Sequence, residues 1–335
     1  MMKALCISSL IAKLGKANPK PPQNHFRYCK IKFFKKKFCS WNKYLIFAVY
    51  YLTNTLMIEV KNLSFGYKKR KLLYKNLNLT LPVGSIYGLL GKNGAGKSTL
   101  LKNLTWLLFP KQGELIVNGF TPKKRLPSFL ETIYFIPEEV YVPSLTIDRY
   151  KNLFSPFYPL FNEEQFYSYL NSLDVHDKGK LNTLSFGQQK KFIIAFALAC
   201  NTKILLLDEP TNGLDIPSKI KFRKLIASVF TEDQMIFIST HQIRDLDNLI
   251  DHVIVIDNGE LLLQAYIAEI EKKLSFKVMD EMPNENNVLF ADSSLKGYAV
   301  VMENKTAEES KVNLEYLFNA VTENPAKAKS IFNTK

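Results

Sequence analysis

The chain lacks several features that would place it in common classes of protein. No apolar run among its 335 residues approaches the roughly 20 that a helix needs to cross a bilayer, so the chain cannot by itself be a channel or a permease. Its four cysteines include no C-x-x-C pair, which argues against a disulfide framework and suits a reducing compartment. Its content of 47% hydrophobic and 23% charged residues is typical of a globular protein.

Acidic residues are absent from the first 56 positions, which hold eleven Lys or Arg. Most of the formal net charge of +14 comes from this segment. The whole chain has 45 Lys and Arg, so 34 remain elsewhere against 31 Asp and Glu, a balance of only +3. A nearly neutral body does not indicate a nucleic-acid surface, and we expect no nucleic-acid partner.

The basic extension over residues 1–56 has two interpretations. Its lysine-rich run at 30–37 and apolar run at 44–52 could lean on an anionic membrane surface. However, the segment shows no helical period, and Met57 directly precedes the first convincing strand, residues 58–60. We favour the second interpretation, in which residues 1–56 are disordered or are not part of the natural protein.

The most informative stretch is residues 91–98, which read Gly-Lys-Asn-Gly-Ala-Gly-Lys-Ser. They fit G-x-x-x-x-G-K-[ST], the phosphate-binding loop of nucleotide triphosphatases. Residues 86–90 read as a buried strand and the residues from Thr99 onward as a helix, so backbone N–H groups can point at phosphate oxygens. Lys97 would reach the β- and γ-phosphates, and the Ser98 hydroxyl would bind Mg²⁺. The residues expected to bind nucleotide here are Gly91, Asn93, Gly94, Ala95, Gly96, Lys97, Ser98 and Thr99. A Gly-rich turn with a chance lysine is the alternative, and the flanking strand and helix argue against it.

The order of elements predicts an α/β fold with a mainly parallel core sheet. Residues 204–207, 235–238 and 253–256 are continuous apolar runs, each followed by polar residues and separated by helical stretches. Such runs indicate parallel strands buried on both faces. Short strands and turns fill residues 57–90, and residues 145–200 are mostly helical and rich in Phe and Tyr.

Two adjacent acids follow the apolar run at 204–207. They would lie at the C-terminal edge of the sheet, where ligands bind in α/β folds. Asp208 can hold Mg²⁺ directly or through water, and Glu209 is placed to polarise an attacking water as general base. A solvated acidic turn is the alternative, which the continuation Pro-Thr-Asn-Gly-Leu-Asp over 210–215 makes weak.

Residues 184–188, Leu-Ser-Phe-Gly-Gln, complete a set of motifs. With them, residues 57–265 resemble the nucleotide-binding subunit of an ABC transporter. In that resemblance, residues 184–188 match the signature L-S-G-G-Q, and Tyr67 matches the aromatic residue that stacks on adenine. Asp208 and Glu209 match the Walker B pair, residues 212–215 match the D-loop, and His241 matches the switch histidine. The fold implied is that of an ABC ATPase, a P-loop NTPase whose core sheet is joined by an antiparallel β subdomain and a helical subdomain.

The resemblance also implies that two ATP molecules are sandwiched between two subunits. Ser185 and Gly187 open a helix whose N-terminus is an anion site. In the family that site, together with Gln188, faces the γ-phosphate held by the other subunit. His241 would contact the γ-phosphate and help orient water and Glu209, whereas the other three histidines have no such context.

Two positions depart from the family pattern. Glu138 stands where the family usually has glutamine. Its carboxylate could join Ser98 and Asp208 in binding Mg²⁺, but it would repel a γ-phosphate that lacks the metal. Phe186 replaces the first signature glycine. Because Ser185 and Gly187 remain, we expect phosphate contact to survive and turnover or coupling to differ.

The function implied is that of an ATP-hydrolysing subunit of a transporter, with ATP and Mg²⁺ as cofactors. ATP binding would close the dimer and hydrolysis would reopen it. We expect the chain to pair with itself or a related ATPase subunit, and to bind an integral membrane permease through residues 139–183, peripherally at the cytoplasmic face of the cell membrane. Residues 266–335 read as a small accessory α+β region of short strands and a terminal helix. They loosely resemble the end of bacterial drug or peptide exporter subunits, which favours export.

The alternative is an ABC ATPase that works outside transport. Ribosome-acting members usually carry two cassettes in one chain, and this chain has one. DNA-repair members insert coiled coils or zinc modules between the phosphate loop and the signature, but here Lys97 and Leu184 are about 87 positions apart with no heptad or cysteine cluster between them. A function in iron–sulfur assembly remains an alternative, although no motif in the sequence indicates it. A non-hydrolysing regulator is disfavoured, because four residues expected to bind or hydrolyse ATP are intact: Lys97, Asp208, Glu209 and His241.

Overall fold

The computed structural model describes residues 56–68, 71–176, 179–246, 248–282, 288–294, 297–305 and 310–332. These ranges belong to one compact unit, Val49–Lys335. The two interpretations of the basic extension concern residues that, apart from the last, lie outside the described ranges. Within those ranges, no helix combines the length and the apolar character that a membrane span requires.

A six-stranded sheet forms the centre of the unit, in the order β5-β6-β7-β3-β8-β9. The first five strands of that order run parallel, and β9 pairs with β8 antiparallel. Every residue of β3, β6 and β7 is buried, which explains their continuous apolar sequences. The predicted mainly parallel sheet is confirmed. Its strands are β3 (Ser85–Leu90), β5 (Ile133–Ile136), β6 (Ile204–Asp208), β7 (Met235–Thr240), β8 (His252–Asp257) and β9 (Glu260–Tyr266).

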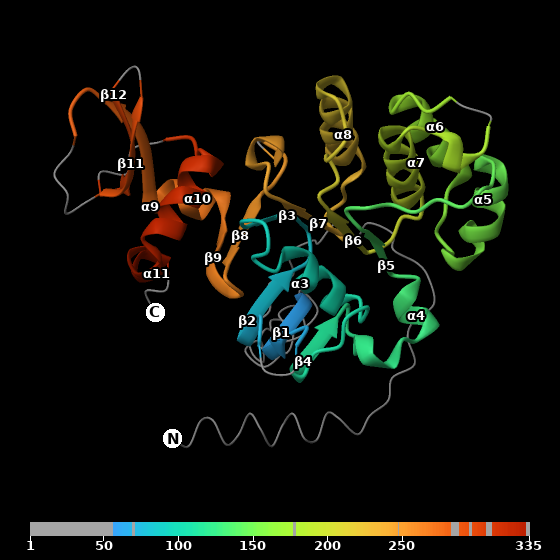
Figure 1. Cartoon of the computed structure of the whole chain (residues 1–335), viewed down its shortest axis with the longest axis horizontal. Helices are drawn as coiled ribbons and strands as arrows, with labels where there is room; N and C mark the ends of the chain where they lie inside the picture. The colour runs from blue at the N-terminus through green and yellow to red at the C-terminus, as the bar shows by residue number, and fades with distance from the viewer. Residues whose placement is uncertain are drawn as a thin grey trace, which may run out of the picture. The chain divides into compact units, whose positions relative to one another are not determined.

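An antiparallel sheet packs below this centre with order β2-β1-β4 (Figure 1). Its strands are β1 (Leu56–Phe65), β2 (Tyr74–Pro82) and β4 (Gln112–Val117). Helix α3 (Lys97–Leu104) follows β3 and lies between the two sheets. Its Leu100, Leu101 and Leu104 belong to a hydrophobic cluster that contains residues of both sheets. The short elements η1 (Pro122–Lys124) and α4 (Pro127–Leu130) lead into β5. This arrangement holds the segment between β3 and α3 at the edge of the core sheet.

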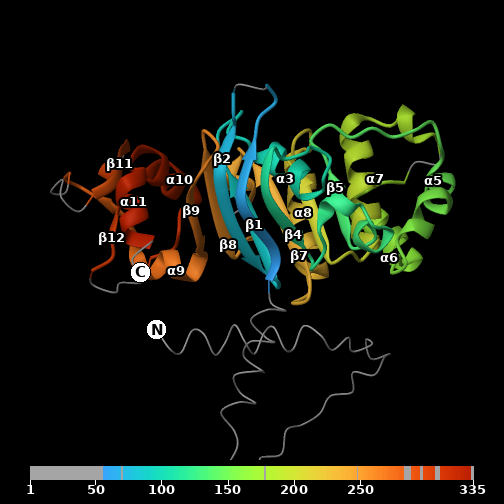
Figure 2. The same cartoon turned by 90° about the horizontal axis from the view of Figure 1, so that it is seen from below.

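Helices gather on one side of the unit and cover the β5 edge (Figures 1 and 2). They are α5 (Ile147–Phe154), η2 (Ser155–Phe157), α6 (Glu163–Ser172), η3 (Leu181–Thr183) and α7 (Phe186–Ala199), and α8 (Ile216–Val229) follows β6. Their core is aromatic, with Tyr150 packed edge-on against Phe192 and Phe196. The aromatic residues of this region fall into a buried group and an exposed group. Phe166 is buried, whereas Tyr141 is 88% exposed and Phe157 is 68% exposed.

The C-terminal residues form a second antiparallel sheet with helices at the opposite end (Figures 1 and 2). The sheet has the order β10-β12-β11. Its elements are α9 (Ile267–Lys273), β10 (Leu274–Met279), β11 (Val288–Ser294), β12 (Gly297–Glu303), α10 (Leu314–Glu323) and α11 (Pro325–Phe332). The expected short strands and terminal helix are therefore present. Leu274, Val301 and Leu317 join the same hydrophobic cluster as the core sheet, and the domain boundary after residue 265 stays a prediction.

Candidate nucleotide-binding site

The loop between β3 and α3 has a backbone that depends on glycine. Gly94 and Gly96 have φ values of 81° and 115°, which L side chains rarely adopt. A Cβ on Gly96 would lie 2.5 Å from the hydroxyl oxygen of Tyr74, and that hydroxyl donates to the Gly96 carbonyl. The loop is therefore tightly wrapped and buttressed from β2, with Gly96 directly before the first turn of α3.

Lys97 holds its ammonium inside this loop. Its Nζ donates to the Gly91 carbonyl at 2.8 Å and lies 3.6 Å from Oε1 of Glu209. The side chain is almost completely buried. A buried cation needs such partners, and these fix it between the loop and the end of β6.

Asp208 lies below the loop at the end of β6 and is fully buried. Burial raises the pKa of this carboxyl above its usual value, while hydrogen bonds from Ser239 and Ser98 act in the opposite direction. The structure therefore brings Ser98 and Asp208 together, as expected. Glu138 lines the same groove as Ser98, and its Oε1 accepts from Nδ2 of Asn212 at 2.9 Å. The Ser98 hydroxyl and the Asp208 and Glu138 carboxylates are oxygen ligands of the kind that Mg²⁺ binds together with phosphate and water.

Glu209 is the most constrained acid of the site. Its φ is 46°, and its backbone N–H donates to the Ser239 carbonyl at 3.0 Å. Oε2 accepts from the Thr240 hydroxyl at 3.0 Å, and Oε1 accepts from the His241 backbone N–H at 2.9 Å. The Nδ1 atom of His241 lies 2.8 Å from the same Oε1. The carboxylate is therefore aimed by the end of β7, with the histidine ring beside it.

A groove of about 810 Å³ runs along these residues. It is lined by ten of the residues singled out from the sequence, namely Tyr67, Asn93, Gly94, Gly96, Lys97, Ser98, Thr99, Glu138, Glu209 and His241. Among these, Tyr67 is 69% exposed, and its hydroxyl lies 2.9 Å from Oγ1 of Thr99. Gly91, Ala95 and Asp208 are buried and do not line the groove. The groove has the size of a small-ligand site.

The signature residues Ser185, Gly187 and Gln188 lie elsewhere, at the start of α7, and do not line this groove. The Ser185 hydroxyl caps the helix and accepts from the Gln188 N–H at 3.3 Å. A Cβ on Gly187 would lie 3.0 Å from the Gly213 carbonyl. Phe186 is 45% exposed, and its ring leaves no room for a side chain at Gly213, where a Cβ would lie 2.6 Å away. The helix start is thus packed against the loop that follows β6.

Lys190 is a residue of this region that sequence reasoning missed. It is fully buried on α7, and its Nζ donates to the carbonyls of Glu209 at 2.7 Å, Glu138 at 2.9 Å and Asn212 at 3.4 Å. Burial lowers its pKa to about 8, against the attraction of Glu138, Glu209 and Asp208. A signal did exist in the sequence, because Lys190 shares the helical spacing of the buried Ile193 and Ile194.

The segment after His241 is also tied to its surroundings. It continues into η4 (Ile243–Leu246). Nε2 of Gln242 donates to Oδ1 of Asn212 at 3.1 Å, and Lys219 on α8 donates to Oε1 of Gln242 at 2.7 Å. Nε of Arg244 pairs with Oε2 of Glu315 on α10 at 2.9 Å. The histidine segment therefore contacts both α8 and the C-terminal region.

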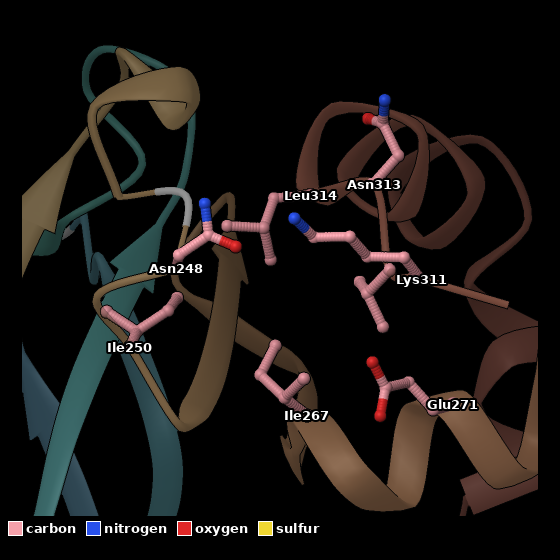
Figure 3. Close-up of a pocket in the computed structure, with 8 residues that line it drawn as sticks. Asn248, Ile250, Ile267, Glu271, Lys311, Asn313 and Leu314 are labelled. Atoms are coloured by element: carbon pink, nitrogen blue, oxygen red, sulfur yellow. The ribbon is translucent and has the colours of Figure 1, made fainter.

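A second cavity, of about 390 Å³, lies beside this segment (Figure 3). Ile250, Ile267 and Leu314 form its apolar wall, and Glu271 and Lys311 add charges of opposite sign. None of its lining residues lines the nucleotide groove, so the two sites are separate.

Comparison with known proteins identifies the family. The sequence model of the family described as "ABC transporter" matches residues 74–212. The "Lantibiotic transport ATP-binding protein SrtF" of Streptococcus pyogenes is 34% identical over 213 residues, which are 62% of this chain and 90% of that protein. This chain belongs to the ABC transporter ATP-binding proteins. The "SkfA peptide export ATP-binding protein SkfE" of Bacillus subtilis is 29% identical over 227 residues, covering 66% of this chain and 94% of that protein.

A solved structure described as "ATP binding subunit of ABC transporter" supports the fold. It has a TM-score of 0.58 and 23% sequence identity, and the match covers 64% of this chain and 92% of that chain. The ABC ATPase fold expected from the sequence is confirmed. As an ATP-binding subunit of this family, the chain binds and hydrolyses ATP and works with a membrane permease component.

Proposed function

We propose that this ABC ATPase drives an exporter, moving its substrate through a separate membrane protein by closing around ATP as a dimer. The observation that carries the proposal is the groove in which Lys97, Glu209 and His241 meet. The direction is inferred from the relatives, since one of them is described as a peptide export protein. That description also favours transport over iron–sulfur assembly.

The residues of the groove suit the parts of an ATP molecule. Tyr67, whose side chain is exposed, would stack on adenine. The loop amides and Lys97 would hold the β- and γ-phosphates, as a helix N-terminus with a lysine favours anions. Ser98, Asp208 and Glu138 would hold Mg²⁺, which neutralises phosphate charge when bound.

Glu209 would act as the general base. In the structure its Oε1 faces both Lys97 and His241, and both would turn toward the phosphates when ATP binds. The freed carboxylate would accept a proton from a water molecule, whose oxygen attacks the γ-phosphorus. The bond from that phosphorus to the bridging oxygen of ADP breaks, and ADP and phosphate leave.

A second subunit would complete each site. Ser185 and Gly187 open α7 with an anion-binding N-terminus, yet within one chain they do not line the groove. A copy of this chain, or a related ATPase subunit, would present these residues and Gln188 to the γ-phosphate. The closed dimer would then depend on ATP.

The membrane partner would dock on the helical side. Tyr141 and Phe157 are large apolar side chains left 88% and 68% exposed within residues 139–183, and exposed apolar residues of this kind mark contact surfaces. The chain would therefore lie peripherally at the cytoplasmic face of the membrane.

The test is purification of the full chain, carrying Glu209→Gln and held with MgATP, from detergent-solubilised membranes. We expect an integral membrane protein to co-purify, and reconstitution of the pair should give ATP-driven substrate movement away from the nucleotide side. Co-purification with iron–sulfur assembly proteins or ribosomes instead would contradict the proposal.

A further inference from the structure

We propose that Lys190 is a positioning residue that couples the signature end of α7 to Glu209, the catalytic base that directly follows β6. The inference rests on the role proposed above for Glu209. It adds a residue outside the recognised motifs, fixed at the junction of three segments that those motifs supply.

The geometry places one ammonium group between three carbonyls. Nζ of Lys190 donates to Glu209 at 2.7 Å, to Glu138 at 2.9 Å and to Asn212 at 3.4 Å. These carbonyls belong to the end of β6, to the segment after β5 and to the loop after β6. An ammonium has three protons and each is used here. A movement of α7 must therefore move these three segments or break the bonds.

A second contact ties the same helix to the loop after β6. The ring of Phe186 lies against Gly213 so closely that a Cβ there would be 2.6 Å from it, and Nζ of Lys190 lies 5.5 Å from the ring centroid. Phe186 stands where the family usually has glycine. Its ring therefore adds a cation–π contact to the hydrogen bonds that hold Lys190.

The charges around Lys190 show why a cation is suited to this position. Glu138, Asp208 and Glu209 each attract it, from two different segments. Because Glu138 replaces a neutral glutamine, this site carries one carboxylate more than the family pattern. A buried ammonium offsets that charge at a point where it also fixes the backbone of Glu138 and Glu209.

The consequence concerns the chemical step more than ATP binding. Ser185 and Gly187 would touch the nucleotide of the other subunit, and Lys190 stands one turn further along the same helix. Closure of the partner's site would thus be passed to Glu209 of this subunit. Loss of the link should misplace the base, and a misplacement of about 1 Å can cost about 10²-fold in rate.

The first test is Lys190→Met, which keeps the length of the stem and removes the charge. We expect kcat to fall about 10²-fold while KM for ATP changes less than about threefold, the pattern of an interaction made in the transition state. Lys273→Met is the control, because Lys273 on α9 likewise donates to a backbone carbonyl, that of Ile331 at 3.0 Å, and lies over the Phe332 ring, but it does not line the groove. Its kcat should be unchanged.

The second test is Lys190→Arg, which keeps a permanent charge and remains informative if the methionine variant fails to fold. The groups facing position 190 are Glu138, Asp208, Glu209 and the Phe186 ring. We expect the arginine variant to keep kcat within about threefold of the unchanged protein, because its guanidinium can still donate hydrogen bonds to the carbonyls of Glu209 and Glu138.

Two results would overturn the inference. One is full kcat in a folded Lys190→Met protein, and the other is a kcat about 10²-fold lower in a folded Lys190→Arg protein. If either result is obtained and the Glu209→Gln protein is inactive, the coupling role of Lys190 is rejected and the role of Glu209 as general base still holds. Normal turnover in Glu209→Gln would instead reject the base on which the coupling acts.

Discussion

Replacing Glu209 with glutamine changes one carboxylate oxygen into an amide and leaves the size of the side chain unchanged. The amide oxygen can take the place of Oε1, which accepts from the His241 N–H at 2.9 Å. The amide nitrogen would then face Thr240, whose hydroxyl lies 3.0 Å from Oε2 and can rotate to accept. The fold and the direction of the side chain should therefore survive the change.

Two effects of Glu209→Gln can be separated. The variant loses the general base, which contributes about 10²–10⁴ in rate, or about 3–5 kcal/mol of activation free energy. It also removes the carboxylate 3.6 Å from the Lys97 ammonium, so the lysine should be freer to bind phosphate. We expect a severe loss of kcat with ATP affinity equal to or tighter than that of the unchanged protein.

The assay combines steady-state ATPase rates, titration with a fluorescent ATP analogue and size-exclusion chromatography with MgATP. We expect a dimer that persists only in the presence of ATP. Turnover within a factor of about two of the unchanged protein would refute the reasoning, since a base worth at least about 10²-fold cannot be lost without effect.

Three further predictions follow from the same groove and core. Lys97→Ala should weaken ATP binding itself, and an unchanged dissociation constant for ATP would contradict the proposal that Lys97 holds the β- and γ-phosphates. Glu138→Gln keeps an acceptor for Asn212 but removes a negative charge, so ATP binding measured in EDTA should tighten severalfold while half-saturating Mg²⁺ rises; no difference in either titration would count against Glu138 as a ligand. The His252 side chain is buried, and neither ring nitrogen has a hydrogen-bond partner among the described residues. Burial lowers the pKa of His252 to about 4. The unfolded chain therefore binds a proton first, and up to about 3 kcal/mol of stability present at pH 7 should be lost as pH falls from about 6.5 to 4. His252→Phe should reduce that loss in urea unfolding, and an equal loss in both proteins would contradict it.

The parts of the site that lie within one continuous segment could be predicted from the sequence. The phosphate loop combines a fixed spacing with a strand before it and a helix after it, and both are present as β3 and α3. Glu209 and His241 directly follow the buried strands β6 and β7, which run parallel, so their meeting at one sheet edge follows from the fold class.

The parts that depend on tertiary packing could not be predicted in the same way. Lys190 is defined by carbonyls 19, 22 and 52 positions away in the chain, and backbone acceptors leave no mark in a sequence. The contact between Phe186 and Gly213 is similar, because it requires knowing how α7 packs on the loop after β6. The expected strands of the C-terminal region were recognised, but not that their apolar residues join the main core.

Cross-linking tests the two-subunit site most directly. Cysteines would be introduced at Asn93, on the phosphate loop, and at Ser185, at the start of α7, in the Glu209→Gln protein. The account predicts that oxidation with MgATP links position 93 of one copy to position 185 of another, giving a dimer that does not form without nucleotide. A monomer closed by a link within one chain, or no link in the presence of MgATP, would contradict it.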